Sequence, residues 1–171
     1  MKDLENTTVN VKTKTCSPIR STMGLEMHVK DVMTRDVLSI QKYESIMHVA
    51  QILSEKSISG LPVVDKENHV IGIITEADIL SIMGIRKETT FKDLLKHIMG
   101  EPLPECKMGD FVGDIMTSPA ATINPRANIA EVVRIMDEKG IRRLPVVNDN
   151  NVLVGIISRA DILKAVIKKL T

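Results

Sequence analysis

The sequence predicts an α/β (α+β) fold in which two β-α-β-β-α units pack on each other about a pseudo-twofold axis. The first observation behind this prediction is an internal duplication. Residues 29–80 align with residues 112–163 without a gap, at an offset of 83, and 23 of the 52 aligned positions are identical. The second is that helix-like and strand-like hydrophobic patterns alternate in the same order in both copies. One copy alone buries too little apolar surface to offset the entropy lost on folding, so the two copies should pack together.

Each copy is expected to open with a short extended segment followed by a helix. The extended segments are residues 37–40 and 120–123. The helix that follows carries apolar residues at the spacing of one buried stripe. In the second copy Asn128 can cap the start of this helix, and Gly140 stands where a left-handed residue ends one.

A hairpin and a second helix complete each copy. A β-branched run, a polar turn and a second apolar run predict the hairpin. The last helix follows directly, because Thr75 and Ser158 mark its first turn. In the first and second copies respectively, the β-branched runs are 61–64 and 144–147, the turns are 65–68 and 148–151, and the last helices are 76–83 and 159–170.

These patterns divide the chain into four parts. A polar N-terminal stretch is expected to be flexible, and a connector between the copies contains a helix at 91–99 that ends before Pro102 and Pro104. The parts are a flexible extension at 1–27, a first repeat at 28–84, a connector with a short helix at 85–111, and a second repeat at 112–171.

Composition disfavours several classes of protein. The formal net charge is +1 with both signs interspersed, and only 2% of residues are aromatic, so nucleic-acid binding is not expected. Cys16 and Cys106 are far apart and form no C-x-x-C pair, which argues against a disulfide framework and a zinc site. Without a signal-like or membrane-spanning apolar run, we expect a soluble, cytoplasmic protein that does not enter a membrane.

Three ordered motifs occur once in each copy: D-V-M-T, L-P-V-V and G-I-I-T-E-A-D-I-L in the first, and D-I-M-T, L-P-V-V and G-I-I-S-R-A-D-I-L in the second. This ordered set closely resembles the CBS domain family and covers about two thirds of the chain. The resemblance implies a tandem (Bateman) module that binds AMP, ADP, ATP, S-adenosylmethionine, methylthioadenosine or a related adenosine compound in the cleft between its repeats. It also implies a homodimer of modules and regulation of an unidentified attached or partner protein, with no catalytic cofactor.

Two tetrads, at 75–78 and 158–161, place a hydroxyl and a carboxylate at the start of a helix. Asp78 and Asp161 can accept hydrogen bonds from the 2′ and 3′ hydroxyls of a ribose, and the exposed N–H groups of a helix start favour a phosphate. By resemblance, the adenine lies against the first strand of the opposite repeat. The predicted ligand-binding residues are Thr75, Asp78, Ala120, Ala121, Thr122, Val37, Leu38, Ser39, Arg142, Arg143, Ser158, Arg159 and Asp161.

The two predicted sites differ in charge. Arg142 and Arg143 precede the second L-P-V-V and Arg159 lies in the second tetrad, where the first repeat has Ser-Gly and Glu. Our hypothesis is that the Asp161 site prefers a phosphorylated nucleotide through forked guanidinium contacts. The Asp78 site would then take a less anionic adenosine compound or stay empty.

Each of these assignments has a structural alternative. The tetrads also fit a capping box, a role compatible with ribose binding because the hydroxyl can cap while Asp keeps acceptor capacity. The residues of the extended segments also fit an ordinary core, and the arginines a solvated face or a partner surface.

Catalysis has little support, because the four His residues are scattered and no phosphate-binding loop or H-E-x-x-H helix occurs. We therefore expect no enzyme and no metal site. The main rival to a ligand sensor is a ligand-independent dimerisation or protein-interaction scaffold.

Overall fold

The computed structural model describes residues 27–82 and 109–170. The rest of the predicted extension, the predicted helix at 91–99, and both cysteines lie outside the described residues. The elements are α1 (Val29–Val32), β1 (Ile40–Gln41), α2 (Ile46–Lys56), β2 (Gly60–Val64), β3 (Val70–Thr75), α3 (Glu76–Ile82), α5 (Val112–Ile115), α6 (Ile129–Glu138), β4 (Arg143–Val147), β5 (Leu153–Ser158) and α7 (Arg159–Leu170).

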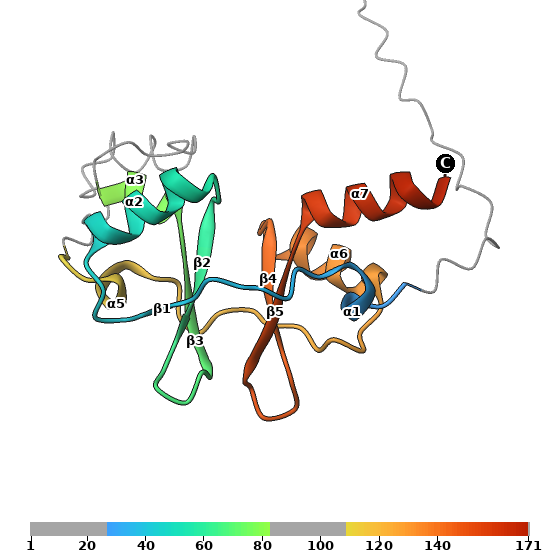
Figure 1. The fold of residues 1–171 in the computed structure, drawn as a ribbon, viewed down its shortest axis with the longest axis horizontal. Helices are drawn as coiled ribbons and strands as arrows, with labels where there is room; N and C mark the ends of the chain where they lie inside the picture. Colours follow the sequence, from blue (N-terminus) through green and yellow to red (C-terminus); the bar gives the residue numbers. More distant parts are fainter. Residues whose placement is uncertain (1–26, 83–108, 171) are drawn as a thin grey trace, which may run out of the picture.

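The predicted hairpins and helices are present in both repeats. Strand β2 pairs antiparallel with β3 and β4 with β5, and the registers correspond, since Leu61 faces Ile74 as Leu144 faces Ile157. Asn128 caps α6 by accepting a bond from the Ala130 backbone, as expected. In Figure 1 the two hairpins stand side by side in the middle of the molecule, with the helices around them.

The predicted extended segments at 37–40 and 120–123 are much shorter as strands than expected. Only Ile40–Gln41 forms a strand, parallel to β2, and the second segment makes a single parallel bridge from Ile123 to Val146. The reason is that both segments cross from one repeat to the other and reach their own repeat only at the end, as the blue chain between α1 and β1 shows in Figure 1.

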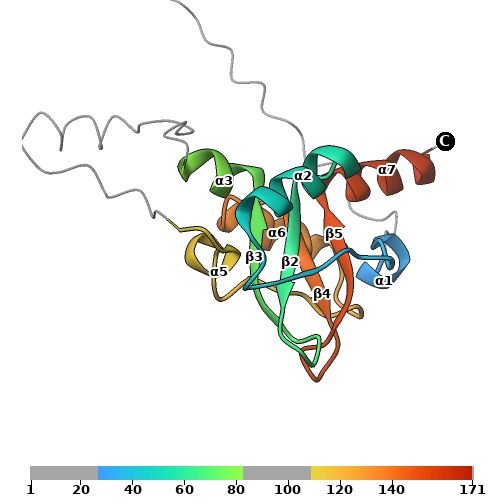
Figure 2. The same ribbon diagram turned by 60° about the vertical axis from the view of Figure 1, so that its left-hand side comes forward.

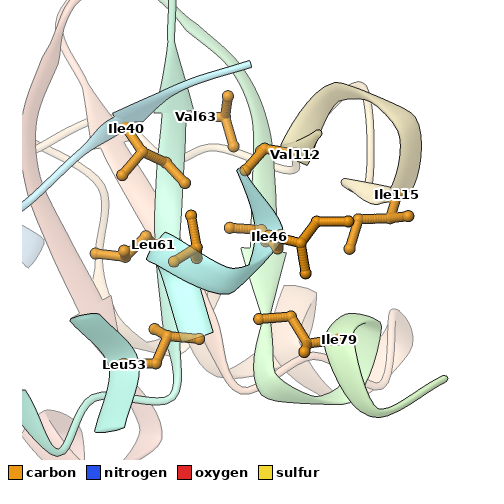
Figure 3. Packing of buried hydrophobic residues seen from close by; sticks show 10 residues of the cluster. Ile40, Ile46, Leu53, Leu61, Val63, Ile79, Val112 and Ile115 are labelled. Atoms are coloured by element: carbon orange, nitrogen blue, oxygen red, sulfur yellow. The ribbon is translucent and has the colours of Figure 1, made fainter. Parts of the chain in front are cut away.

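The two sequence repeats exchange their first helices in space. Helix α5, which begins the second sequence repeat, packs Val112 and Ile115 into the core beneath α2 of the first repeat, and Figure 3 shows these side chains beside Ile46 and Val63. In the same way α1 packs Val29 into the core of the second repeat. Figure 2 shows α5 beside β3 and α1 beside β5.

Close backbone pairing accompanies this exchange. Ile73 and Thr117 exchange two backbone hydrogen bonds, with N–O distances of 3.0 and 2.9 Å, and Thr34 and Ile156 do the same at 2.9 Å each. A methyl group at Gly72 would lie 2.7 Å from the sulfur of Met116 and 3.0 Å from the Thr117 carbonyl oxygen, so only glycine fits here without displacing a neighbour.

A pseudo-twofold axis relates the contacts between the repeats. The Val70 N–H donates to Asn151 O at 3.1 Å, and the Leu153 N–H donates to Asn68 O at 3.0 Å; each bond maps onto the other through the offset of 83. A third apolar cluster, made by Val64, Val70, Val147 and Leu153, lies on the same contact and joins the two units. Within the described part of the chain, no helix is both long and apolar enough to cross a membrane.

Candidate ligand site between the repeats

The two tetrads have nearly the same geometry. One oxygen of Asp78, Oδ2, accepts bonds from the Thr75 backbone N–H at 2.8 Å and from the Thr75 hydroxyl at 2.7 Å. In the second repeat, Asp161 Oδ2 accepts the same two bonds from Ser158 at 2.9 and 2.6 Å. The capping interaction expected of these residues is therefore present at the start of both α3 and α7.

Capping uses only one oxygen of each carboxylate. Among the described residues, no hydrogen bond reaches Oδ1 of Asp78 or Oδ1 of Asp161. Both side chains are only partly buried. Each tetrad therefore holds a carboxylate in a fixed orientation with acceptor capacity left for another group.

Arg143 reaches from the second repeat into the first. Its guanidinium donates to the hydroxyl of Ser59, and a methyl group at Gly60 would overlap it. Burial lowers the pKa of Arg143 below its usual value; the neighbouring Arg142 adds to this effect, while the Glu76 and Asp78 carboxylates oppose it.

The structure places the Arg143 guanidinium against the first repeat, whereas the sequence analysis expected it at the Asp161 site. Strands β3 and β4 are neighbours across the pseudo-twofold axis, so a long side chain at the start of β4 reaches the first repeat. Gly60 supplies the space, because it has no side chain. The Arg143 guanidinium therefore contacts the repeat that carries Asp78.

The other two predicted arginines are placed differently. Arg159 donates from its guanidinium to Met136 O at 3.1 Å, within its own repeat. Arg142 is exposed, and its backbone carbonyl accepts a bond from the Arg159 N–H at 3.0 Å. Of the three arginines, only Arg143 makes a hydrogen bond to the other repeat within the described part of the chain.

The residues predicted to face the adenine lie on the two crossing segments. Val37 and Ala120 are partly buried against the apolar cluster between the repeats, and Ala121 packs on the core of the second repeat. Leu38 is 47% exposed. Ser39 and Thr122 are half-buried. These segments therefore combine core packing with some accessible aliphatic surface.

A shallow pocket of about 600 Å³ includes one predicted site residue, Thr122, together with Arg126, Glu131 and Asn148. All the residues around it belong to the second repeat, and neither tetrad aspartate is among them. It is therefore not a space shared by the repeats, and the site described above does not depend on it.

In the segments that the structure describes, one group of side chains has ligand atoms close enough to hold a metal ion. Ligand atoms of Asp65, Glu67 and His69 lie within 4.8 Å of one another at the β2–β3 turn. Asp65 Oδ1 already accepts the backbone N–H groups of Glu67 and His69, at 3.0 and 2.8 Å. Asn148 makes the same two contacts in the second repeat, so the arrangement is explained by the turn itself.

Ser59, Gly60 and Glu76 were not among the predicted site residues, although the structure places them around Arg143. A comparison of aligned positions in the two repeats could have identified them, because a large residue in one repeat can fill the space left by a small residue in the other. Arg143 aligns with Gly60, so one copy has a long basic side chain where the other has none.

A duplicated α/β module with a carboxylate-bearing helix start in each copy defines a class of paired repeats, and comparison with known proteins identifies it. The CBS domain profile matches residues 29–85 and 112–168. The chain therefore belongs to the CBS domain family and contains two copies of that domain.

Sequence relatives agree with this family. The chain is 34% identical to the uncharacterized protein MJ1404 of Methanocaldococcus jannaschii over 146 residues, which are 85% of this chain and 33% of that protein. It is 28% identical to MJ1426 of the same organism, over 84% of this chain and 94% of that protein. The chain thus spans only a third of the first relative and nearly the whole of the second.

Solved structures with the same fold include proteins with bound adenosine compounds. The structure of CBSX2 in complex with AMP has a TM-score of 0.68 and 27% identity, covering 84% of this chain and 98% of that chain. The CBS domain pair of MJ0100, in complex with 5′-methylthioadenosine and S-adenosyl-L-methionine, has a TM-score of 0.66 and 26% identity, covering the same shares of each chain.

Proposed function

We propose that this CBS pair is a regulatory module that binds an adenosine-containing ligand between its two repeats. The observation that carries the proposal is the second oxygen of Asp78 and of Asp161, which capping leaves without a partner among the residues described. A fixed, partly buried carboxylate suits the vicinal hydroxyls of a ribose, because each charge-assisted bond contributes roughly 1.5–3 kcal/mol.

Similar proteins support the ligand class. CBSX2 was solved with AMP and the MJ0100 pair with methylthioadenosine and S-adenosylmethionine, so the shared part of these ligands is adenosine. In this chain we place the base against the crossing segments, with Ala120, Ala121 and Thr122 opposite Asp78, and Val37, Leu38 and Ser39 opposite Asp161. Aliphatic walls suit a chain with 2% aromatic residues.

We further propose that the phosphorylated ligand binds at the Asp78 site. Arg143 supports this because its guanidinium reaches Ser59 and Gly60 in the repeat that carries Asp78 and can make forked contacts to a phosphate. The Asp161 site lacks an equivalent residue, since Gly60 occupies the position that matches Arg143. A ligand without a phosphate, or no ligand, is expected there.

The module is proposed to act on another protein or domain rather than to catalyse a reaction, and to work in the cytoplasm. One relative is an inosine-5′-monophosphate dehydrogenase of which this chain matches 22%, an example of an enzyme with a comparable segment. Exposed apolar side chains on the helices favour a protein contact, for which we propose a second copy of this chain. They include Met47, Leu80, Val133 and Leu163.

A thermal-shift screen with AMP, ADP, ATP, S-adenosylmethionine and methylthioadenosine tests the ligand class, with GMP as the control for the base. A ligand at about 100 times its Kd should stabilise the fold by about 2.7 kcal/mol, which gives a visible rise in Tm. No shift with any adenosine compound, or an equal shift with GMP, would contradict the proposal. The scaffold function would then be the better account of the exposed helices.

A further inference from the structure

The Arg143 guanidinium occupies a position where the start of β2 and the start of α3 meet. It donates to the Ser59 hydroxyl and passes over Gly60. The Ser59 carbonyl in turn accepts the backbone N–H of Glu76, at 3.3 Å. A side chain from the second repeat is therefore held directly next to the first turn of α3.

Glu76 is the first residue of α3, and its carboxylate and that of Asp78 both attract the Arg143 guanidinium. The Asp78 carboxylate also accepts the Thr75 hydroxyl. The Glu76 side chain is exposed, and within the described part of the chain its carboxylate is not engaged in a cap or turn of its own. The Glu76 carboxylate therefore contributes to the charge at the site and not to a hydrogen bond that holds the fold.

We propose that Glu76 is a specificity-determining residue of the Asp78 site, acting as the counter-charge of Arg143 in the ligand-free protein. This inference rests on the proposed function. A ligand phosphate has to compete with Glu76 for the guanidinium, whereas a ligand without a phosphate meets no such competition. Glu76 therefore weakens the binding of phosphorylated adenosine compounds relative to uncharged ones, and so reduces the difference in affinity between the two classes.

The second repeat lacks this arrangement. Arg159 aligns with Glu76, and its guanidinium is bonded to Met136 O in its own repeat. The position that would carry the opposing arginine is Gly60. Discrimination between charged and uncharged ligands by an opposed Glu and Arg is therefore confined to the Asp78 site.

Isothermal titration with AMP and with methylthioadenosine tests the inference, because the two ligands share adenosine and differ in the charge at the 5′ position. Removing one charge from a partly solvated site should change binding modestly, so we expect Glu76→Gln to tighten AMP about three- to tenfold. Methylthioadenosine should change less than about twofold, because it has no charge for Glu76 to oppose. Glu76→Asp should resemble the wild type.

Two further variants test whether Glu76 affects AMP binding through Arg143. Glu138→Gln is the matched control, because it also removes a carboxylate beside an arginine, Arg134, but on α6; it should leave both affinities unchanged. In an Arg143→Met background, Glu76→Gln should lose its effect on AMP, since the counter-charge then has nothing to oppose.

The outcomes separate the two proposals. If the wild type binds neither ligand, the adenosine function fails and this inference fails with it. If the wild type binds AMP but Glu76→Gln leaves the ratio of the two affinities unchanged, only the role of Glu76 is overturned. If Glu76→Gln tightens AMP binding equally in the Arg143→Met background, Glu76 does not act through Arg143, and its role as counter-charge is overturned.

Discussion

Asparagine at Asp78 or at Asp161 separates the capping role of these residues from their proposed ligand role. The amide keeps one acceptor oxygen for the cap but loses the charge and the second acceptor. Since the two tetrads have nearly the same hydrogen-bond lengths, the two variants should destabilise the ligand-free protein equally.

The expected magnitudes come from these contacts. Because the cap keeps its oxygen, each variant should lose about 0.5–1 kcal/mol of the free energy of unfolding, at the low end for helix caps. That corresponds to a fall in Tm of about 1–4 °C. For AMP, exchanging two charge-assisted ribose bonds for neutral ones costs about 2–3 kcal/mol, or a loss of about 30- to 150-fold in affinity.

Thermal unfolding without ligand and isothermal titration with AMP measure the two effects separately. Asp78→Asn should lose most AMP binding and Asp161→Asn little, because Arg143 reaches into the repeat that carries Asp78. Asp137→Asn, an exposed aspartate on α6, is the control. Undiminished AMP binding in both tetrad variants would refute the ribose role, and a large difference between their ligand-free stabilities would refute the equivalence of the caps.

Three further predictions concern stability and assembly. Gly72→Ala should cost about 1–3 kcal/mol in a denaturant titration, because its methyl would lie 2.7 Å from the Met116 sulfur; adding Met116→Ala should recover part of the loss, and no loss at all would contradict this packing. The backbone N–H of His69 is the main cause that holds the pKa of Asp65 below its usual value, so Asp65 stabilises the fold above its unfolded pKa and loses this as the pH falls through the lower folded value. The difference in Tm between wild type and Asp65→Asn should therefore shrink between about pH 6 and about pH 3, and a constant difference would argue against it. Leu163 is 61% exposed on α7, so Leu163→Asp should convert the proposed homodimer to monomers in sedimentation velocity; an unchanged sedimentation coefficient would remove α7 from the interface.

Local signals in the sequence predicted the hairpins and the helix starts well. The capping residue Asn128 and the hydroxyl–carboxylate pairs of the tetrads act within a few residues, so the pattern alone determines their bonds. Gly140 likewise adopts φ +63°, the left-handed conformation expected at that helix end. The duplication supported the hairpins and the two tetrads twice.

The exchange of the first helices was not predicted, because it depends on contacts between distant parts of the chain. The D-V-M-T and D-I-M-T motifs were recognised only as landmarks, whereas the structure uses them for α1 and α5. For the same reason the extended segments were expected to be full strands. Nothing in their local pattern indicates that they cross to the other repeat.

The direction of Arg143 also lay beyond the sequence, and an exchange of residues between the repeats would test whether this arginine selects the ligand site. The backbone bonds are duplicated pair by pair: Glu76 N–H donates to Ser59 O as Arg159 N–H donates to Arg142 O. The charged residues at these positions are therefore not needed for the fold, and their difference is free to distinguish two sites.

Exchanging the two dipeptides, with S59R and G60R combined with R142S and R143G, should move the arginine to the Asp161 side while keeping the total charge. Each strand would then carry a dipeptide that its counterpart already accommodates at the same register. AMP binding should become sensitive to Asp161→Asn instead of Asp78→Asn, by about the same 30- to 150-fold. If AMP remains dependent on Asp78 after the exchange, the arginine does not select the site, and the preference must come from the crossing segments, which differ between the repeats at Leu38 and Ala121.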